Sequence, residues 1–131
     1  MSFKVKPEIR VLAVTGVFKP AGRITILGVV FRGNLWFDGT VKGSVKADGN
    51  QALGLSRTVK RSNHYGQVRV LLIDGEFPWK LQDEDWEKLS KRLKRPIILL
   101  LERFGGAGFT PMKGGRIWIK AYGLGLDEAL K

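Results

Sequence analysis

A short apolar run in the middle of the chain ends in a carboxylate. Val68 to Ile73 is rich in β-branched residues and leucine, and Asp74-Gly75 follows it directly. Its length and composition predict a strand buried on both faces, as in a mostly parallel sheet. Because α/β sheets bind ligands beyond the carboxyl ends of such strands, Asp74 is the first candidate for chemistry. With further carboxylates beside it, that chemistry would be metal-dependent phosphodiester cleavage, in which Mg²⁺ ions bridge the attacking and leaving oxygens.

The sequence offers few partners for Asp74. A single carboxylate binds Mg²⁺ poorly, since this ion gives up its water reluctantly. Asp48, Asp38 or Glu76 could complete a relocated set, and if the chain is an enzyme we expect Asp74 and Asp48 to act. The alternative is a structural role, in which Asp74 accepts backbone N–H groups from the turn after its strand. We predict no catalytic residue, no metal ligand set and no cofactor.

Two other motifs could carry chemistry. His64 is the only histidine, so it forms no metal cluster and no evident nucleophile–base pair, and we expect it in a turn. The run FGGAGFTPMKGGR, Phe104 to Arg116, lacks the spacing of phosphate-binding glycine loops. It combines Phe104 and Phe109 with Lys113 and Arg116, which suits base stacking beside phosphates; the alternative is that both phenylalanines fill the core.

The net charge of +11, with a pI near 10.3, is the strongest compositional signal. It exceeds the roughly 2–8 charges that solubility requires, and it favours a polyanionic partner, nucleic acid rather than a membrane surface. Residues 1–73 carry a net charge of +9 and residues 74–131 carry +2. The alternative is a basic surface that serves solubility alone. The candidate phosphate-binding residues are Arg32, Lys42, Lys46, Arg57, Lys60, Arg61, Lys91, Arg92, Lys94, Arg95, Lys113 and Arg116.

Length and composition limit the class of protein. A chain of 131 residues predicts a single domain over 1–131. No apolar run approaches the ~20 residues of a membrane span, and the N-terminus shows no signal-peptide pattern. Cysteine is absent, so disulfides and thiolate metal sites are excluded and a cytoplasmic location is expected.

The elements that would position these residues follow from periodicity and turn residues. Strands are predicted at Glu8–Val14, Arg23–Arg32, Leu35–Lys46, Val68–Ile73, Ile97–Leu101 and Ile117–Tyr122. Helices are predicted over Gln51–Ser62, from Asp83 to before Pro96, and over Leu126–Lys131, with a glycine-rich loop at Phe104–Gly115. Three hairpin-connected strands followed by alternating helices and strands predict an α/β fold, a mixed sheet with helices packed on it.

The run SNHYGQVRVLLIDG, Ser62 to Gly75, resembles the signature of an archaeal family related to endonuclease V, domain of unknown function 99. EIRVLAV, LGVVFRG, LWFDGTVKGSVKADG, RPIILLLER and GRIWIKAYGLGLDEAL resemble other segments of that family, in the same order. The resemblance implies a ribonuclease H-like fold. A segment between Arg103 and Gly115 is missing relative to the family.

The same resemblance implies where a metal site would be lost. The family's first strand ends in two aspartates, and the matching positions here are Thr15 and Gly16. The family's D-G-x-D-A-T run is replaced by Asp48-Gly49-Asn50-Gln51-Ala52-Leu53. We therefore expect a shortened, non-catalytic nucleic-acid-binding protein, with RNA preferred over DNA and a ribosomal or other ribonucleoprotein assembly as its setting. The alternatives are an active Mg²⁺-dependent endonuclease and a protein–protein adaptor.

Overall fold

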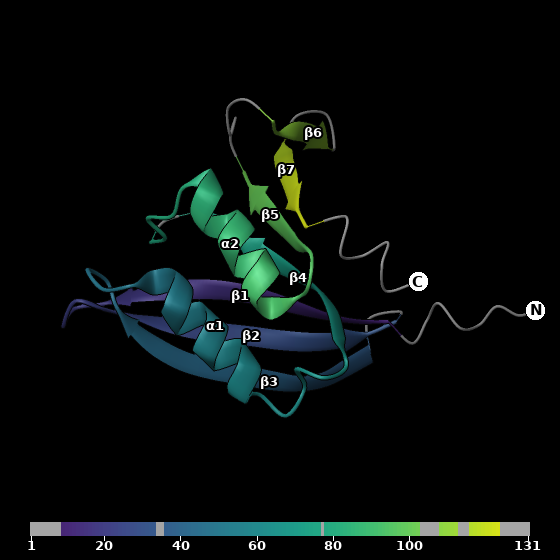
Figure 1. Ribbon diagram of the computed structural model, residues 1–131, viewed down its shortest axis with the longest axis horizontal. Helices are drawn as coiled ribbons and strands as arrows, with labels where there is room; N and C mark the ends of the chain where they lie inside the picture. The colour runs from purple at the N-terminus through teal and green to yellow at the C-terminus, as the bar shows by residue number, and fades with distance from the viewer. Residues whose placement is uncertain (1–8, 34–35, 77, 103–107, 113–115, 124–131) are drawn as a thin grey trace, which may run out of the picture.

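The computed structural model describes residues 9–33, 36–76, 78–102, 108–112 and 116–123. These form a seven-stranded sheet in the order β3-β2-β1-β4-β5-β7-β6, with two helices (Figure 1). The strands are β1 (Arg10–Lys19), β2 (Arg23–Arg32), β3 (Trp36–Lys46), β4 (Val68–Asp74), β5 (Ile97–Leu101), β6 (Thr110–Met112) and β7 (Ile117–Tyr122); the helices are α1 (Gln51–Arg61) and α2 (Asp83–Leu93).

The sheet is mixed, as the sequence predicts. β1, β2 and β3 form an antiparallel meander, while β4 pairs in parallel with both β1 and β5. β7 then pairs antiparallel with β5 and with β6. β4 is thus a central parallel strand, and its carboxyl end lies where the sequence places the candidate chemistry.

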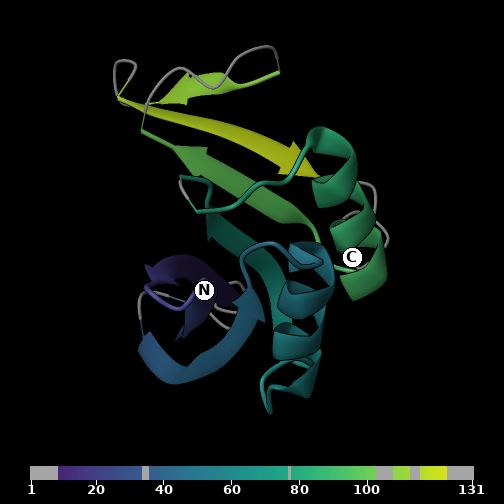
Figure 2. The same cartoon turned by 90° about the vertical axis from the view of Figure 1, so that its left-hand side faces the viewer.

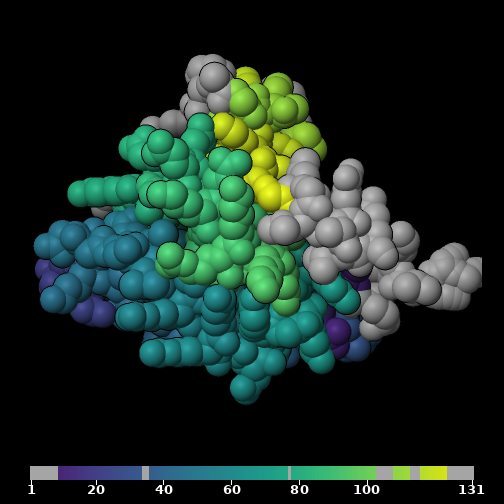
Figure 3. Space-filling model, in the orientation of Figure 1, coloured from purple at the N-terminus to yellow at the C-terminus, as the bar shows by residue number. Residues whose placement is uncertain are grey.

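Both helices pack on the same face of the sheet, as the side view in Figure 2 shows. They lie next to each other across the face seen in Figure 3. Alternate strand residues such as Leu12, Val14 and Ile26 are buried under them, because successive strand side chains point to opposite faces. Apolar residues of the helices complete this core, namely Leu55, Val59, Trp86, Leu89 and Leu93. No helix within the described ranges has the length and apolarity needed to cross a membrane.

The helix boundaries follow from their caps. Asn50 starts α1 by accepting a hydrogen bond from the backbone N–H of Leu53, at 3.0 Å. Gln82 and Asp85 form a capping box at the start of α2, whose first turn is acidic and suits the positive end of the helix. α2 ends at Leu93, and its C-cap residue Lys94 is left-handed (φ 57°), so the predicted end before Pro96 is confirmed.

Two predicted elements differ in the structure. β1 runs on to Lys19 instead of ending near Val14, because it pairs with β2 along its whole length. Residues 110–112, predicted as part of a loop, form β6 at the edge of the sheet through pairing with β7. The remainder of the predicted glycine-rich loop is only partly described, and the predicted helix at 126–131 lies outside the described residues.

α1 approaches β3 closely, and two glycines make this possible. A Cβ atom built on Gly43 would lie 2.2 Å from Oγ1 of Thr58, and one on Gly54 would lie 2.6 Å from Cγ2 of Val45. One glycine lies on the strand and the other on the helix. Side chains at either position would therefore push α1 away from the edge of the sheet.

We expect Gly54→Ala to lower the free energy of unfolding by about 1–3 kcal/mol, the usual cost of overpacking. Helix propensity alone would give the opposite sign, a gain of about 1 kcal/mol. Chemical denaturation followed by circular dichroism measures the difference. Gly66→Ala is the matched control, because nothing lies within 4 Å of a Cβ atom there. A Gly54→Ala protein more stable than the parent would show that α1 is not seated this closely.

Candidate functional site

Asp74 ends β4 with an exposed carboxylate whose two oxygens are both hydrogen-bonded. Oδ1 accepts the backbone N–H of Glu76 at 3.1 Å, and Oδ2 accepts the hydroxyl of Thr15 at 3.2 Å. The first contact caps the turn after the strand, which is the structural role considered from the sequence. The second joins β4 to the first strand at the place where the family resemblance implies an acidic partner.

The neighbouring position on β1 is covered by an aromatic ring. A Cβ atom built on Gly16 would lie 2.7 Å from Cζ2 of Trp79 and 3.0 Å from Cγ2 of Ile24. Trp79 comes from the segment between β4 and α2 and packs against the core. An acidic side chain at position 16 would therefore collide with the indole unless Trp79 moved.

The other candidate carboxylates form no group of three with Asp74 within the described ranges. Asp48 lies in the turn beyond β3, whereas Asp38 lies near the beginning of β3, at the other end of that strand. The carboxylate of Glu76 accepts the backbone N–H of Glu102 at 2.8 Å. Within the described ranges, no group of three or more His, Cys, Asp or Glu side chains could hold a metal ion. Mg²⁺ sites in nucleases are built from clustered oxygen ligands, and the described residues place no such group of three around Asp74.

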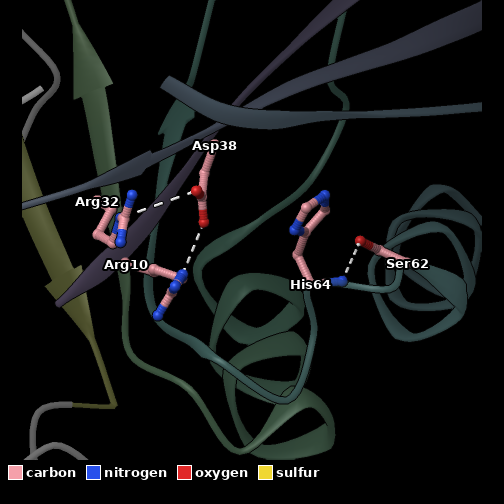
Figure 4. Close-up of polar contacts among 5 residues, drawn as sticks. All are labelled: Arg10, Arg32, Asp38, Ser62 and His64. Atoms are coloured by element: carbon pink, nitrogen blue, oxygen red, sulfur yellow. Dashed lines mark hydrogen bonds and ion pairs between the residues drawn. The ribbon is translucent and has the colours of Figure 1, made fainter. Parts of the chain in front are cut away.

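Asp38 instead forms an ion cluster with two arginines. Nε of Arg10 donates to Oδ2 at 2.7 Å, and Nε of Arg32 lies 3.8 Å from Oδ1 (Figure 4). The hydrogen bond from Arg10 lowers the pKa of the Asp38 carboxyl, with smaller contributions from Arg32 and His64. Arg32, predicted to bind phosphate, is thus part of an ion cluster that joins the first three strands.

His64 lies in the turn between α1 and β4, as predicted. Its backbone N–H donates to Oγ of Ser62 at 2.9 Å. Its ring rests on Gly39, where an added Cβ atom would be 2.5 Å from Nε2. The ring therefore packs this turn against β3.

An open cleft of about 640 Å³ adjoins the turn after Asp74. Its residues include Gly75, Trp79, Trp86, Phe109, Asp83 and Tyr122. Phe109 also packs against the core, as the second of the two roles considered for the phenylalanines requires, and Phe104 lies outside the described residues. The carboxylates of Asp83 and Glu84 line the cleft, so it is not a surface that attracts phosphate.

A basic groove lies on the opposite side of α1, between this helix and the edge strand β3. Two adjoining hollows of about 430 and 250 Å³ form it, and they share Lys42, Thr58 and Arg61. The lining of this groove includes no acidic residue and five cationic residues, namely Arg57 and Arg61 on α1 and Arg23, Lys42 and Lys46 on β2 and β3. We call this feature the basic groove.

The basic groove gathers four of the predicted phosphate-binding residues and adds one that sequence reasoning missed. Arg23 pairs with Lys46 across the β2–β3 ladder, and its Nε donates to Oγ of Ser44 at 2.8 Å. The predicted hairpin contained part of the signal. Strands at Arg23–Arg32 and Leu35–Lys46 joined by a two-residue turn would place Arg23 opposite Ser44, whereas the observed register, which shifts between Val30 and Phe31, places it opposite Lys46.

Arg95 was predicted to bind phosphate, and the structure gives it a different role. Its guanidinium donates to the backbone carbonyls of Val68 at 2.6 Å and Tyr65 at 3.1 Å, and it lies 4.6 Å from the centre of the Tyr65 ring. These contacts fasten the end of α2 to the start of β4. We therefore remove Arg95 from the phosphate-binding set.

The other predicted cations are dispersed. Lys60, Lys91 and Lys94 are exposed on the helices outside the basic groove, and Arg92 lines a separate small hollow between α1 and α2. Arg116 is exposed before β7, and Lys113 lies outside the described residues. The structure therefore separates the basic clusters that the sequence could not distinguish.

Residues 7–108 match the model of a protein family described as endonuclease dU. The chain belongs to the endonuclease dU family. A UPF0215 protein from Methanosarcina acetivorans is 32% identical over 105 residues, which are 79% of this chain and 54% of the relative. The chain thus spans about half the length of the archaeal relatives it matches. The resemblance to an archaeal endonuclease V-like family is confirmed.

Solved structures confirm the ribonuclease H-like fold. A protein of unknown function from Archaeoglobus fulgidus superimposes with a TM-score of 0.72 and 18% identity, covering 92% of this chain and 82% of the other. Endonuclease V of Ciona intestinalis, solved with a 24mer DNA containing an inosine followed by a ribo-adenosine, gives a TM-score of 0.63 and 10% identity, covering 98% and 78%. At these identities the similarity concerns the fold alone.

The acidic side of the cleft yields a pH-dependent prediction. Oδ1 of Asp83 accepts the hydroxyl of Tyr122 at 2.6 Å, and Oδ2 accepts Nζ of Lys120 at 3.0 Å. Both hydrogen bonds lower the pKa of Asp83, and the bond from Tyr122 has the larger effect. A carboxylate whose pKa is lower in the folded than in the unfolded protein stabilises the fold when the pH is above the unfolded pKa of about 3.9. This stabilisation is lost as the pH falls through the pKa of the folded protein.

We therefore expect Tyr122→Phe to cost about 1 kcal/mol at pH 7 and less at pH 3, measured by chemical denaturation at both pH values. Tyr65→Phe is the matched control, because the Tyr65 hydroxyl donates to the backbone carbonyl of Leu93 at 2.6 Å, a group that does not titrate. Equal pH dependence in the two variants would contradict the role of Asp83.

Proposed function

We propose that this chain binds nucleic acid through the basic groove and does not cleave it. The observation that carries the proposal is the convergence of five cations from β2, β3 and α1 along one groove whose lining holds no carboxylate. Such a surface suits a phosphodiester backbone, because phosphate contacts from Lys and Arg release condensed counterions.

The neutral groups of the basic groove fit the same partner. Hydroxyls of Thr40, Ser44 and Thr58 lie among the cations. Hydroxyl and amide side chains are common partners of phosphate oxygens, and they orient a backbone without reading its sequence. The groove is therefore suited to backbone binding rather than to base-specific recognition.

Four contacts support our expectation that the chain does not cleave nucleic acid. Both oxygens of Asp74 already accept hydrogen bonds, Trp79 covers the β1 position next to Thr15, and Glu76 is tied to the backbone of Glu102. These contacts account for the positions of both carboxylates without a metal ion. They support our proposal that Asp74 acts as a turn cap.

RNA remains our expected partner in preference to DNA, within a ribonucleoprotein in the cytoplasm. The compact, strongly basic composition supports this expectation. Endonuclease V of Ciona intestinalis, with the same fold, is described in complex with DNA. Parallel titrations with RNA and DNA of equal length and sequence test the preference.

We expect the logarithm of the binding constant to fall linearly with the logarithm of salt concentration, with a slope of roughly −2 to −4.5 for three to five phosphate contacts. Arg57→Glu with Arg61→Glu should weaken binding to all sequences and flatten the slope by about 1.5. Fluorescence anisotropy with labelled oligonucleotides at several salt concentrations measures both effects.

The matched control is Lys91→Glu with Lys94→Glu. This pair changes the net charge equally but lies outside the basic groove. If both pairs weaken binding to the same extent, the net charge of the protein, and not the basic groove, is responsible for the binding. If the parent protein shows no affinity at low salt, the adaptor hypothesis replaces ours.

A second candidate function is metal-dependent endonuclease activity. Membership of the endonuclease dU family favours it, as does Asp74 at the end of the central parallel strand. We expect no product when the protein is incubated with single-stranded, duplex and inosine-containing DNA and RNA in Mg²⁺ or Mn²⁺. Gel electrophoresis of end-labelled substrates measures this. Metal-dependent cleavage that disappears in Asp74→Asn would establish the nuclease instead.

A further inference from the structure

The edge strand β3 carries two exposed aromatic side chains at its beginning. Trp36 is 68% exposed and Phe37 is 63% exposed, the highest values among the exposed large hydrophobic residues of the described ranges. Consecutive strand residues point to opposite faces, so the two rings flank the edge of the sheet. Exposed rings of this size are costly in water unless a partner covers them.

The local backbone presents these rings through a β-bulge. The β2–β3 register shifts between Val30 and Phe31, leaving Asp38 as the extra residue between the pairs Val30–Gly39 and Phe31–Phe37. The ion cluster with Arg10 and Arg32 holds Asp38 in place. Bulges of this kind re-aim the side chains beside them, here Phe37 and Trp36.

The same strand continues into the basic groove. Thr40, Lys42, Ser44 and Lys46 line the groove farther along β3. The aromatic pair and the last cation are separated by about 30 Å, given a rise of ~3.3 Å per residue. A flexible polyanion of several nucleotides could contact both regions at once. The turn containing His64 lies between them and packs on Gly39.

We propose that the nucleic acid bound in the basic groove is single-stranded and that its bases stack on Trp36 and Phe37. The inference rests on the proposed function and specifies its ligand class. In a duplex the bases are stacked on one another, so exposed rings beside a phosphate track gain contacts only from unpaired bases. Base stacking on aromatic side chains tolerates any sequence, as does the groove.

The test compares an unstructured single strand with a duplex of the same length at one salt concentration, by fluorescence anisotropy. Trp36→Ala with Phe37→Ala should weaken single-strand binding on the order of tenfold to a hundredfold and change duplex binding less than twofold. The slope with salt should stay the same, because the phosphate contacts remain. Circular dichroism confirms that the variants fold.

Three controls separate stacking from general hydrophobic contact. Trp36→Leu with Phe37→Leu keeps apolar surface without aromatic rings and should lose single-strand affinity like the alanine pair, whereas Trp36→Tyr with Phe37→Tyr should retain it. Met112→Ala removes a 46% exposed apolar side chain from the opposite edge of the sheet and should have no effect.

The outcomes distinguish the stacking inference from the proposed binding in the basic groove. If the parent protein binds and the alanine pair binds single strands equally well, the stacking inference fails while groove binding stands. If the leucine pair keeps full affinity, the rings act as apolar surface and stacking is again rejected. If the parent binds no nucleic acid, both the stacking inference and the proposed groove binding fail.

Discussion

The close seating of α1 on the edge strand β3 is the constraint on which the rest of the surface depends. Gly43 and Gly54 remove the side chains that would separate the helix from the strand. The helix thereby presents Arg57 and Arg61 beside Lys42 and the other cations of β3. Like charges repel, so such an arrangement is costly without a polyanion, and apolar packing of α1 on the sheet offsets that cost.

At the carboxyl end of β4, structural contacts hold the residues at which the family resemblance implies a metal site. The hydroxyl of Thr15 and the backbone N–H of Glu76 hold Asp74, and the indole of Trp79 fills the space over Gly16. These contacts stabilise the turn after the strand. In our proposal these contacts stand in place of a metal centre, so the stability of this turn and the lack of cleavage have the same origin.

Two hollows of the molecule carry charges of opposite sign, acidic residues in the cleft and cationic residues in the basic groove. The cleft beside Asp74 includes Asp83 and Glu84, whereas the groove on the far side of α1 is lined by cations. A nucleic-acid backbone would be directed to the groove and away from the cleft. Because interactions between exposed charges are screened beyond about 10 Å at 0.1 M salt, each hollow acts largely on its own.

Periodicity and turn residues in the sequence determined the mixed sheet, the order of the elements and the limits of α2, since these depend on local patterns such as the acidic first turn at Asp83. The excess of positive charge was equally visible. Only the tertiary structure decided which cations line one groove, because strand register and the seating of α1 place Arg23 and Arg57 on the same hollow, while Arg95 donates to the backbone of Val68. The same holds for Trp79 over Gly16, a contact between distant segments that no local pattern encodes.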